Sequence, residues 1–442
     1  MNRASVANRR GPHLAGLFAV LLLFFPGEVA WAAPQPVLAV ASIAELKAAD
    51  GARTPILQVT GYYSGSLLGG GLFVWQSGGR PPDNCTVFAT GNGKGAWVRR
   101  LEDGVLDVTL CGAHWDGASD DAEAISAAFT VASANGFSLS CPGGTGRIAS
   151  TVAPAHFANV VLRCRGMAAS TLTCAVEARP CFLFQNPAGP QAVQAPQIYD
   201  LGIVSGRMPH GPSVVIQYNS IGGGFRDDGT TQNYMMRPIV QRVQISGGGI
   251  GIQCSKCFDG DFSLDALSYQ GRHGFDIEGS DWMSLGDAGS NRIERTGGPP
   301  IRLASHGTFG NGDLVSHNDI LWPAPGVETY VYSSARTTYL EKNFFEGATG
   351  GACEITIDTG AAHAVARDNH VTDRTVKNWL CVVPQLRQAD FSDNQTTSHG
   401  QGPARFENKG AWKDLFFRHA IVHSGNWSEE GFPSSWTLLG FF

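Results

Sequence analysis

An asparagine recurs at a nearly constant interval between residues 285 and 398, and no other part of the sequence restricts the fold as strongly. Successive copies are 27, 25, 26 and 25 residues apart, and a fixed period of this size is typical of stacked supersecondary units. Apolar or small residues stand three before each copy and, apart from Thr396, two after it. This spacing indicates strands rather than helices. The five copies are Asn291, Asn318, Asn343, Asn369 and Asn394.

A polar side chain that repeats in register within an apolar pattern needs hydrogen-bonding partners. In stacked parallel strands, roughly 4.8 Å apart, the amides of successive copies would donate to and accept from one another. Asparagine also tolerates the left-handed backbone of a sharp bend between strands. The repeat therefore predicts an all-β fold, a right-handed, single-stranded parallel β-helix with about 25 residues per coil. The alternative is chance asparagine spacing in a β-sandwich.

The first 32 residues have the pattern of a cleavable secretory signal peptide. A basic start is followed by an apolar run from Leu14 to Phe25 and by the small-residue pattern Ala30-Trp31-Ala32. The run is too short to span a bilayer, and no later segment is long enough either. We therefore expect a secreted or periplasmic protein without a membrane span.

The rest of the chain divides into three parts. Residues 33–105 predict a small β-rich module that begins with a short helix capped by Ser42 and Glu45. Residues 106–400 predict the β-helix, and the aromatic-rich residues 401–442 predict a cap or tail at its open end. We expect a turn at Gly69-Gly70-Gly71 and a long loop between coils at 206–238.

Charge and cysteine content exclude some functions. The net charge of −6 gives no basic stripe, so nucleic-acid binding has no support. The ten cysteines all follow the signal pattern, and their even number favours disulfides over metal thiolates in an exported protein. Cys141 and Cys164 are nearly one coil apart, and Cys174 and Cys181 would close a short loop. The pair at Cys254-Ser255-Lys256-Cys257 would be only half a zinc site, so no metal site is predicted.

Four motifs occur together before the first coil: Gly112-Ala113, the segment Asp116–Asp121 with three aspartates, an alanine-rich helical run to Ala134, and Cys141-Pro142-Gly143-Gly144. In this combination the chain resembles the pectate lyase superfamily of β-helix proteins, particularly members that share an entry segment with phage tailspikes. The resemblance covers roughly residues 40–175, and His114-Trp115 and Arg147-Ile148 depart from the usual motif.

The resemblance implies that the alanine-rich helix plugs the entrance of the β-helix. Asp120 and Asp121 would then cap this helix and interact with its positive end, rather than act in catalysis. Relatives of the tailspike type are often trimers, so a homotrimer is a possible assembly, and calcium is a possible cofactor because it serves similar lyases.

Candidate catalytic residues lie on the outside of the predicted coils, because the interior is filled. Positions one and three after each ladder asparagine should face outward. Asp319 and Glu346 would then be one coil and two residues apart, roughly 8 Å between Cα atoms, and Asp319 and Glu294 would be equally spaced. Carboxylates about 6.5–9.5 Å apart suit inverting glycoside hydrolysis. The alternative is a solvated face of weak ion pairs.

Cleavage of a uronate by β-elimination needs a base and a cation that neutralises the sugar carboxylate. The candidate bases are Lys342, His317 and His370. The candidate substrate-binding residues are the cations Arg292, Arg336 and Arg367 and the stacking rings Trp322 and Tyr339.

These observations predict a secreted enzyme that cleaves a polysaccharide on the side of a β-helix, with elimination slightly favoured over hydrolysis. The alternatives are a non-catalytic carbohydrate-binding or structural β-helix, and a uronate epimerase.

Overall fold

The structure is a computed structural model. It describes residues 37–78, 80–187, 191–221, 233–305, 310–327, 329–347, 353–358, 361–372, 378–382, 388–392, 394–396, 405–406 and 416–417. The described residues from Leu38 onward belong to one unit. The predicted signal peptide lies outside the described residues, as does most of the predicted C-terminal tail. In the described part of the chain, no helix is both long and apolar enough to cross a membrane.

The N-terminal module is a five-stranded sheet with one short helix, α1 (Ile43–Ala48). Its strands, in the order β1-β2-β3-β5-β4, are β1 (Leu38–Val40), β2 (Ile56–Gly61), β3 (Gly69–Ser77), β5 (Gly95–Arg99) and β4 (Val87–Ala89). Ser42 caps α1, as predicted, by accepting from the N–H of Glu45. The turn predicted at Gly69-Gly70-Gly71 is wrong, because these glycines begin β3, where backbone of Val59 and Thr60 leaves no room for a side chain at Gly70.

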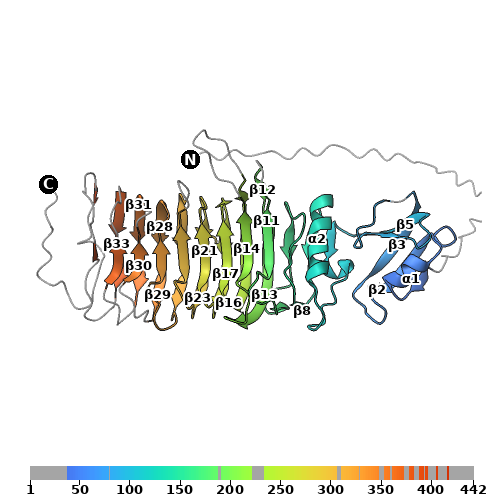
Figure 1. The fold of residues 1–442 in the computed structure, drawn as a ribbon, viewed down its shortest axis with the longest axis horizontal. Helices are drawn as coiled ribbons and strands as arrows, with labels where there is room; N and C mark the ends of the chain where they lie inside the picture. The colour runs from blue at the N-terminus through green and yellow to red at the C-terminus, as the bar shows by residue number, and fades with distance from the viewer. Residues whose placement is uncertain are drawn as a thin grey trace, which may run out of the picture. The chain divides into compact units, whose positions relative to one another are not determined.

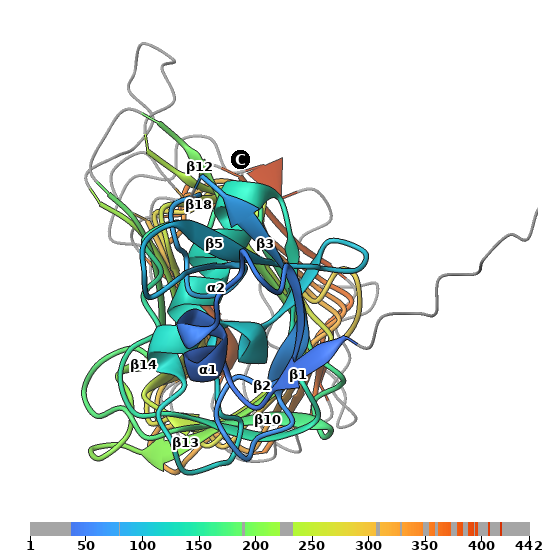
Figure 2. The ribbon, with the colours of Figure 1, turned by 90° about the vertical axis from the view of Figure 1, so that its right-hand side faces the viewer.

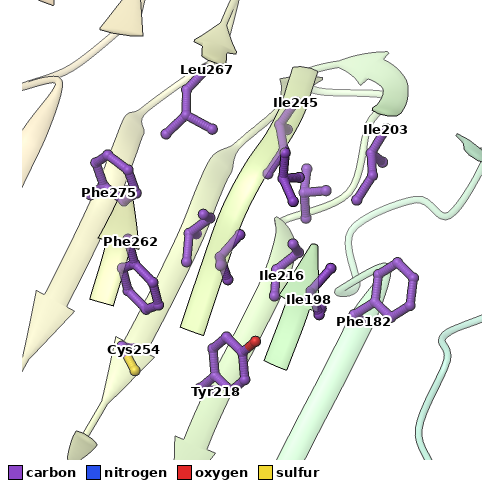
Figure 3. Close-up of a cluster of buried hydrophobic side chains, with 14 of the residues drawn as sticks. Phe182, Ile198, Ile203, Ile216, Tyr218, Ile245, Cys254, Phe262, Leu267 and Phe275 are labelled. Atoms are coloured by element: carbon purple, nitrogen blue, oxygen red, sulfur yellow. The ribbon is translucent and has the colours of Figure 1, made fainter. Parts of the chain in front are cut away.

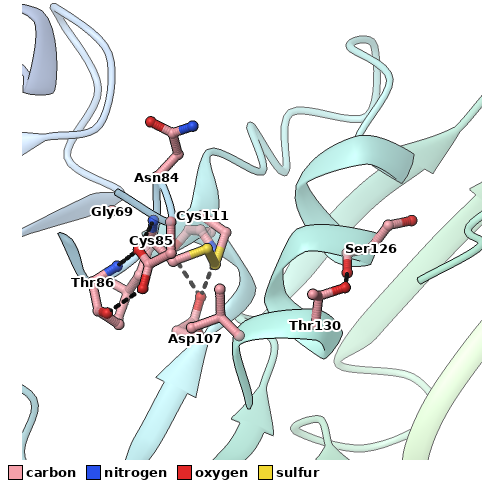
Figure 4. Close-up of a disulfide and its surroundings, with 12 residues drawn as sticks. Gly69, Asn84, Cys85, Thr86, Asp107, Cys111, Ser126 and Thr130 are labelled. Carbon is pink, nitrogen blue, oxygen red and sulfur yellow. Dashed lines mark hydrogen bonds between the residues drawn. A yellow bond between two sulfur atoms is a disulfide. The ribbon is translucent and has the colours of Figure 1, made fainter. Parts of the chain in front are cut away.

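The module is joined covalently to the segment that leads into the β-helix. Cys85 forms a disulfide with Cys111, which ends the short 3-10 helix η1 (Val108–Cys111) (Figure 4). Arg99 is buried and donates to carbonyl oxygens on both sides of this junction, among them those of Cys85 and Leu110, at 2.9 and 3.3 Å. Burial lowers the pKa of Arg99 to about 10.

The alanine-rich run forms α2 (Ala122–Asn135), which lies across the first coils (Figure 2). Phe129 of α2 packs edge-on against Phe184 of the β-helix interior, with ring centroids 5.2 Å apart. The predicted capping role of Asp121 is wrong: its carboxylate makes no cap bond and instead accepts from the N–H groups of His114 and Arg147. Asp120 accepts from the N–H of Ala122 at 3.2 Å, which is the predicted role.

The remaining strands form a right-handed parallel β-helix, as predicted, in three columns of strands (Figure 1). We name them columns 1, 2 and 3 in the order in which the chain visits them within a coil. Column 1 consists of β19 (Asp261–Ser263), β22 (Ser284–Leu285), β25 (Asp313–Ser316), β28 (Thr337–Glu341), β31 (His363–Arg367), β34 (Gln388–Ser392) and β37 (Phe416–Phe417). Column 2 consists of β20 (Ala266–Ser268), β23 (Arg292–Glu294), β26 (Asp319–Leu321), β29 (Phe344–Glu346), β32 (His370–Val371) and β35 (Gln395–Thr396).

Column 3 is a nine-stranded parallel sheet. Its strands are β11 (Phe182–Asn186), β14 (Val214–Ser220), β17 (Ile250–Ser255), β21 (His273–Glu278), β24 (Ile301–Ala304), β27 (Val331–Ser333), β30 (Cys353–Ile357), β33 (Asn378–Val382) and β36 (Arg405–Phe406). The loop predicted at 206–238 is therefore wrong in part, because β14 belongs to this sheet and β15 (Met235–Met236) pairs with β12 (Val193–Gln194) and β18 (Cys257–Phe258).

Earlier coils use longer strands. β13 (Gln197–Arg207) and β16 (Ile239–Gly248) each run through columns 1 and 2 without a break and pair with each other. The first coils are built from β6 (Val105–Asp107), β7 (Ser138–Ser140), β8 (Gly144–Ile148), β9 (Val161–Arg163) and β10 (Ser170–Cys174).

The interior is apolar, and aromatic rings stack along it (Figure 3). Phe184, Tyr218, Phe262 and Phe275 follow one another with ring centroids 5.3, 6.2 and 5.9 Å apart. Stacked rings bury large apolar areas and fill the cylinder, so no channel runs through this part of the β-helix. Function must therefore lie on the outside.

The asparagine ladder is confirmed and lies at the bend between columns 1 and 2. Each Nδ2 donates to the Oδ1 of the next copy, at 2.9, 2.9, 3.0 and 2.8 Å. The same position one coil earlier is occupied by Asp265, whose N–H donates to Oδ1 of Asn291 at 2.9 Å. The ladder thus extends one coil further than the sequence indicates, with a buried carboxyl as its first member.

The ten cysteines form five disulfides, which confirms the prediction of disulfides over metal thiolates. The suggested pairs Cys141–Cys164 and Cys174–Cys181 are both present. Cys254 and Cys257 are bonded to each other, so neither thiolate is available to zinc. The other pairs are Cys85–Cys111 and Cys353–Cys381.

Candidate active site on column 2

The outward face of column 2 carries the predicted carboxylates in the predicted register. Asp319 pairs with Phe344, and Leu321 pairs with Glu346, so Asp319 and Glu346 are one coil and two residues apart. Asp319 pairs with Arg292 in the other direction, and Glu294 pairs with Leu321, which gives Glu294 the same offset. Alternation along a strand turns the intervening Ile293, Ile320 and Phe345 into the core.

The two acids that flank Asp319 differ in their partners. Glu294 accepts from the guanidinium of Arg292 at 3.2 Å, and its side chain is about one-fifth exposed. Asp319 is exposed and Glu346 is half-buried, and neither forms an ion pair with a described residue. Because a paired carboxylate is held in place by its cation, Asp319 and Glu346 are the two acids available to a substrate.

An exposed aromatic ring lies beside this pair. Trp322 follows β26 at the bend that leads out of column 2, and 42% of its surface is exposed. A Cβ on Gly347 would be only 2.6 Å from Cδ1 of Trp322, so the indole lies against the backbone that follows Glu346. Trp322 itself has a left-handed backbone, with φ of 42°, which is uncommon for a bulky side chain. Tyr269 and Arg295 have the same left-handed backbone at the corresponding bend of earlier coils, so this conformation belongs to the bend itself.

The predicted bases lie at two places. His317 and Lys342 occupy successive positions at the ladder bend, both exposed and both with left-handed backbone. Their N–H groups donate to the carbonyl oxygens of Glu341 and Arg367 in the next coil. His370 is in column 2, where its ring is tilted against that of Phe344 with centroids 5.4 Å apart.

The remaining predicted substrate-binding residues are on column 1 or before it. Arg367 lies 4.0 Å from Glu341 in an exposed ion pair at the end of column 1. Tyr339 faces outward in the middle of β28, between Leu314 and Val365. Arg336 precedes β28, five residues before Glu341, or roughly 16 Å along an extended strand. The structure therefore does not bring Arg336 to the Asp319–Glu346 pair.

No metal site is built into the part of the chain that the structure describes, where no three His, Cys, Asp or Glu side chains are grouped closely enough to hold an ion. The expectation of calcium rests on the resemblance alone. A pocket of about 390 Å³ lies elsewhere, beside Ser133, His156, Phe157 and Asn186, and none of the predicted site residues lines it.

One polar cluster escaped the sequence analysis, on the outward face of column 3. Nε2 of Gln217 donates to Gln253 at 2.6 Å, Nε2 of Gln253 donates to Asp276 at 3.0 Å, and Arg302 donates to the other oxygen of Asp276. The register of β14, β17, β21 and β24 places these side chains in one row. They satisfy one another, and Asp276 is only 2% exposed, so the row stabilises the sheet. The intervals between its members are 36, 23 and 26 residues, so only the last two are near the coil period and no regular repeat marks the row in the sequence.

A second missed feature consists of two arginine–tyrosine–arginine stacks. Cζ of Arg163 lies 4.3 Å and that of Arg242 5.5 Å from the ring centroid of Tyr199. Cζ of Arg207 lies 4.0 Å and that of Arg295 5.3 Å from the centroid of Tyr269. In each stack the three residues come from three different coils, so no local motif reveals them.

Comparison with known proteins supports the tailspike part of the resemblance. Residues 39–103 match the sequence model of a family described as the phage tail protein small four-stranded β-sheet domain. No curated protein matches the chain. The pectate lyase superfamily is not among these findings and stays a prediction.

Solved tailspikes share the fold. A tailspike protein of Acinetobacter baumannii bacteriophage Fri1, described as a capsular polysaccharide depolymerase, has a TM-score of 0.54 and 14% identity over 88% of this chain and 76% of its own. Tailspike protein 2 of Escherichia coli O157:H7 bacteriophage CAB120 has a TM-score of 0.52 and 14% identity over 85% of this chain. This chain covers 50% of that tailspike's length. At such identities the likeness concerns the fold, which is the parallel β-helix of the tailspike type.

Proposed function

We propose that the protein is a polysaccharide-cleaving enzyme whose active site is the outward face of β23, β26 and β29. The observation that carries the proposal is the register of Asp319 and Glu346, which sets them one coil and two residues apart. This offset corresponds to roughly 8 Å between Cα atoms, within the range that leaves room for a water between an acid and a base. Hydrolysis with inversion is the reaction that this geometry favours.

Each residue has a distinct role in this proposal. Trp322 stacks on a sugar ring, as exposed aromatic side chains do on apolar sugar faces. A sugar ring stacked on Trp322 would cover the half-buried Glu346 of the next coil more than it covers the exposed Asp319. We therefore assign Glu346 as the acid that protonates the leaving oxygen and Asp319 as the base that activates water. Arg292 pairs with Glu294 and holds its side chain beside them.

Elimination from a uronate is the second candidate. Its support is the pair of exposed side chains His317 and Lys342 at the ladder bend, next to the same face. In that reaction Lys342 or His317 would remove the proton beside the sugar carboxylate. The two reactions yield different products, since only elimination creates an unsaturated sugar that absorbs in the ultraviolet.

Export and assembly are part of the proposal. The signal pattern in residues 1–32 and the five disulfides support a secreted or periplasmic location. The fold shared with tailspikes supports a glycan as substrate and a homotrimer as assembly, and the Fri1 tailspike that shares it is a capsular polysaccharide depolymerase.

The test is the release of reducing ends and of ultraviolet-absorbing products from acidic and neutral polysaccharides. We expect reducing ends without new absorbance, and a loss of about 100-fold or more in Asp319→Asn and in Glu346→Gln. Glu278→Gln is the matched control, because Glu278 is a half-exposed carboxylate on column 3. Unchanged rates in both column 2 variants would contradict the assignment, and new absorbance would favour elimination.

A further inference from the structure

The two arginine–tyrosine–arginine stacks differ in one respect, the presence of a carboxylate. In the first, Asp200 lies between the arginines and accepts from Arg163 at 3.2 Å and from Arg242 at 2.6 and 3.0 Å. The hydrogen bond from Arg242 is the main reason that the pKa of Asp200 lies below its ordinary value. In this stack one carboxylate therefore bridges the two guanidinium groups and offsets one of their two positive charges.

The second stack has no such partner. Arg207 and Arg295 are exposed, and within the part of the chain that the structure describes neither lies within 4.0 Å of a carboxylate oxygen. Two guanidinium groups held against one ring repel each other, and a shared anion removes that repulsion. Guanidinium groups are also the preferred protein partners of carboxylates, because their geometry allows paired hydrogen bonds.

The backbone explains how the second stack forms. Tyr269 and Arg295 occupy the bend at the end of column 2 in successive coils, both with left-handed backbone, at φ of 61° and 57°. In the coil before Tyr269 the bend residue is Gly247, which follows the Ser246–Ser268 pair and has no side chain. Arg207, from the coil before that, can therefore reach the ring of Tyr269.

The same bend continues into the candidate active site. Each bend residue donates its backbone N–H to a carbonyl oxygen at the end of the column 2 strand in the next coil. The donor and acceptor pairs are Tyr269 and Glu294, Arg295 and Leu321, and Trp322 and Glu346. The stack and Trp322 thus form one row along the edge of column 2, next to the acidic residues. A polyanion placed over this acidic face would be repelled unless cations lie beside it, and Arg207 and Arg295 supply that charge.

We propose that Arg207, Tyr269 and Arg295 form a subsite for a sugar carboxylate, so that the glycan recognised here is a uronate-containing polysaccharide. The ligand carboxylate would bridge Arg207 and Arg295 as Asp200 bridges Arg163 and Arg242. Tyr269 holds the two guanidinium groups in place. The assignment of a cleaved substrate rests on the proposed function, whereas binding of the carboxylate does not.

The test is isothermal titration of the full mature chain carrying Asp319→Asn, to prevent turnover. The probes are oligosaccharides of galacturonate, mannuronate and glucuronate, the same oligosaccharides with their carboxyl groups reduced to alcohols, and sulfated oligosaccharides without carboxyl groups. We expect at least one uronate series to bind about tenfold or more tightly than its reduced form. Adding Arg207→Ala or Arg295→Ala should weaken that binding by about tenfold each, and salt should weaken it further.

Two matched variants separate binding from general damage. Arg163→Ala removes an arginine from the carboxylate-bridged stack, where Arg242 still holds Asp200, and should leave glycan affinity unchanged. Tyr269→Phe keeps the ring and should retain affinity, whereas Tyr269→Ala should lose it. Equal binding of carboxylated and reduced forms, a preference for the sulfated probes, or full affinity in Arg207→Ala/Arg295→Ala would overturn the proposal.

The outcome is also distinct from that of the proposed function. Arginine-dependent uronate binding by a protein that never releases reducing ends would keep this subsite and reject the enzyme. Cleavage that is indifferent to both arginines would keep the enzyme and reject the subsite.

Discussion

Truncation of one ladder asparagine should destabilise the β-helix far more than its single side chain suggests. In Asn343 the Oδ1 accepts from the N–H and Nδ2 of Asn318, at 3.1 and 2.9 Å. Its Nδ2 donates to the carbonyl of Val315 and to Oδ1 of Asn369, at 2.9 and 3.0 Å. Asn343→Ala removes all four bonds at a site that is 1% exposed.

The cost follows from which groups keep a partner. The side chain of Asn318 still donates to the carbonyls of Leu285 and Ser316, but its buried N–H loses its acceptor. A buried donor without a partner costs about 1–3 kcal/mol, and each other lost bond costs about 1 kcal/mol. We therefore expect Asn343→Ala to lower the free energy of unfolding by roughly 5 kcal/mol.

Equilibrium unfolding in urea measures this change, and hydrogen exchange at the Asn318 amide locates it. Lys342→Ala is the matched control, because Lys342 is the exposed neighbour of Asn343. Lysine and alanine both carry a Cβ, so this substitution does not change the backbone strain at the left-handed position 342. The control should change stability by less than about 0.5 kcal/mol. A loss below about 1 kcal/mol in Asn343→Ala, with the Asn318 amide still protected, would refute the reasoning.

Three further predictions concern other parts of the chain. Burial raises the pKa of the Asp265 carboxyl well above 3.8, so the folded protein keeps a proton that the unfolded chain releases. The free energy of unfolding should therefore fall as pH rises above about 3.8, the pKa of the unfolded carboxyl. Asp265→Asn removes this titration, so it should raise the unfolding midpoint more at pH 8 than at pH 4. An equal shift of the midpoint at both pH values would contradict the burial of a protonated Asp265. Gly347→Ala places a Cβ 2.6 Å from Trp322 and should shift the tryptophan fluorescence and weaken glycan binding; unchanged affinity would argue against the stacking role. Replacing Cys85 and Cys111 by alanine opens a loop with a sequence separation of 26 residues. We expect the free energy of unfolding, measured by thermal denaturation, to fall by about 3.5 kcal/mol because the unfolded chain gains conformational entropy. An unchanged free energy would contradict this reasoning, since it would mean that the unfolded chain is rigid without the disulfide.

The sequence predicted the β-helix because its ladder is periodic. Asn318, Asn343 and Asn369 recur at the coil length, and the same period sets which neighbours face outward, so Asp319 and Glu346 were placed correctly relative to each other. Asp265 was missed although it lies 26 residues before Asn291, because a carboxyl does not look like an amide in a residue pattern. Only its burial reveals that it takes the same position.

Features that depend on the varying connections between coils could not be predicted. Arg207 meets Tyr269 across two coils because Gly247 has no side chain between them, and the register of β13 shifts between Val204 and Arg207. Arg336 was grouped with Arg367 because both are cations near the ladder in sequence. The structure separates them, because Arg336 precedes the column 1 strand β28 and Arg367 is the last residue of the next column 1 strand, β31.

The most direct measurement is the structure of the Asp319→Asn/Glu346→Gln protein with a bound oligosaccharide of its best substrate. A sugar ring should lie against Trp322, with a glycosidic oxygen near residue 346 and a water beside residue 319. An oligosaccharide bound instead across column 3, over Gln253 and Arg302, would contradict the assignment of the active site to column 2.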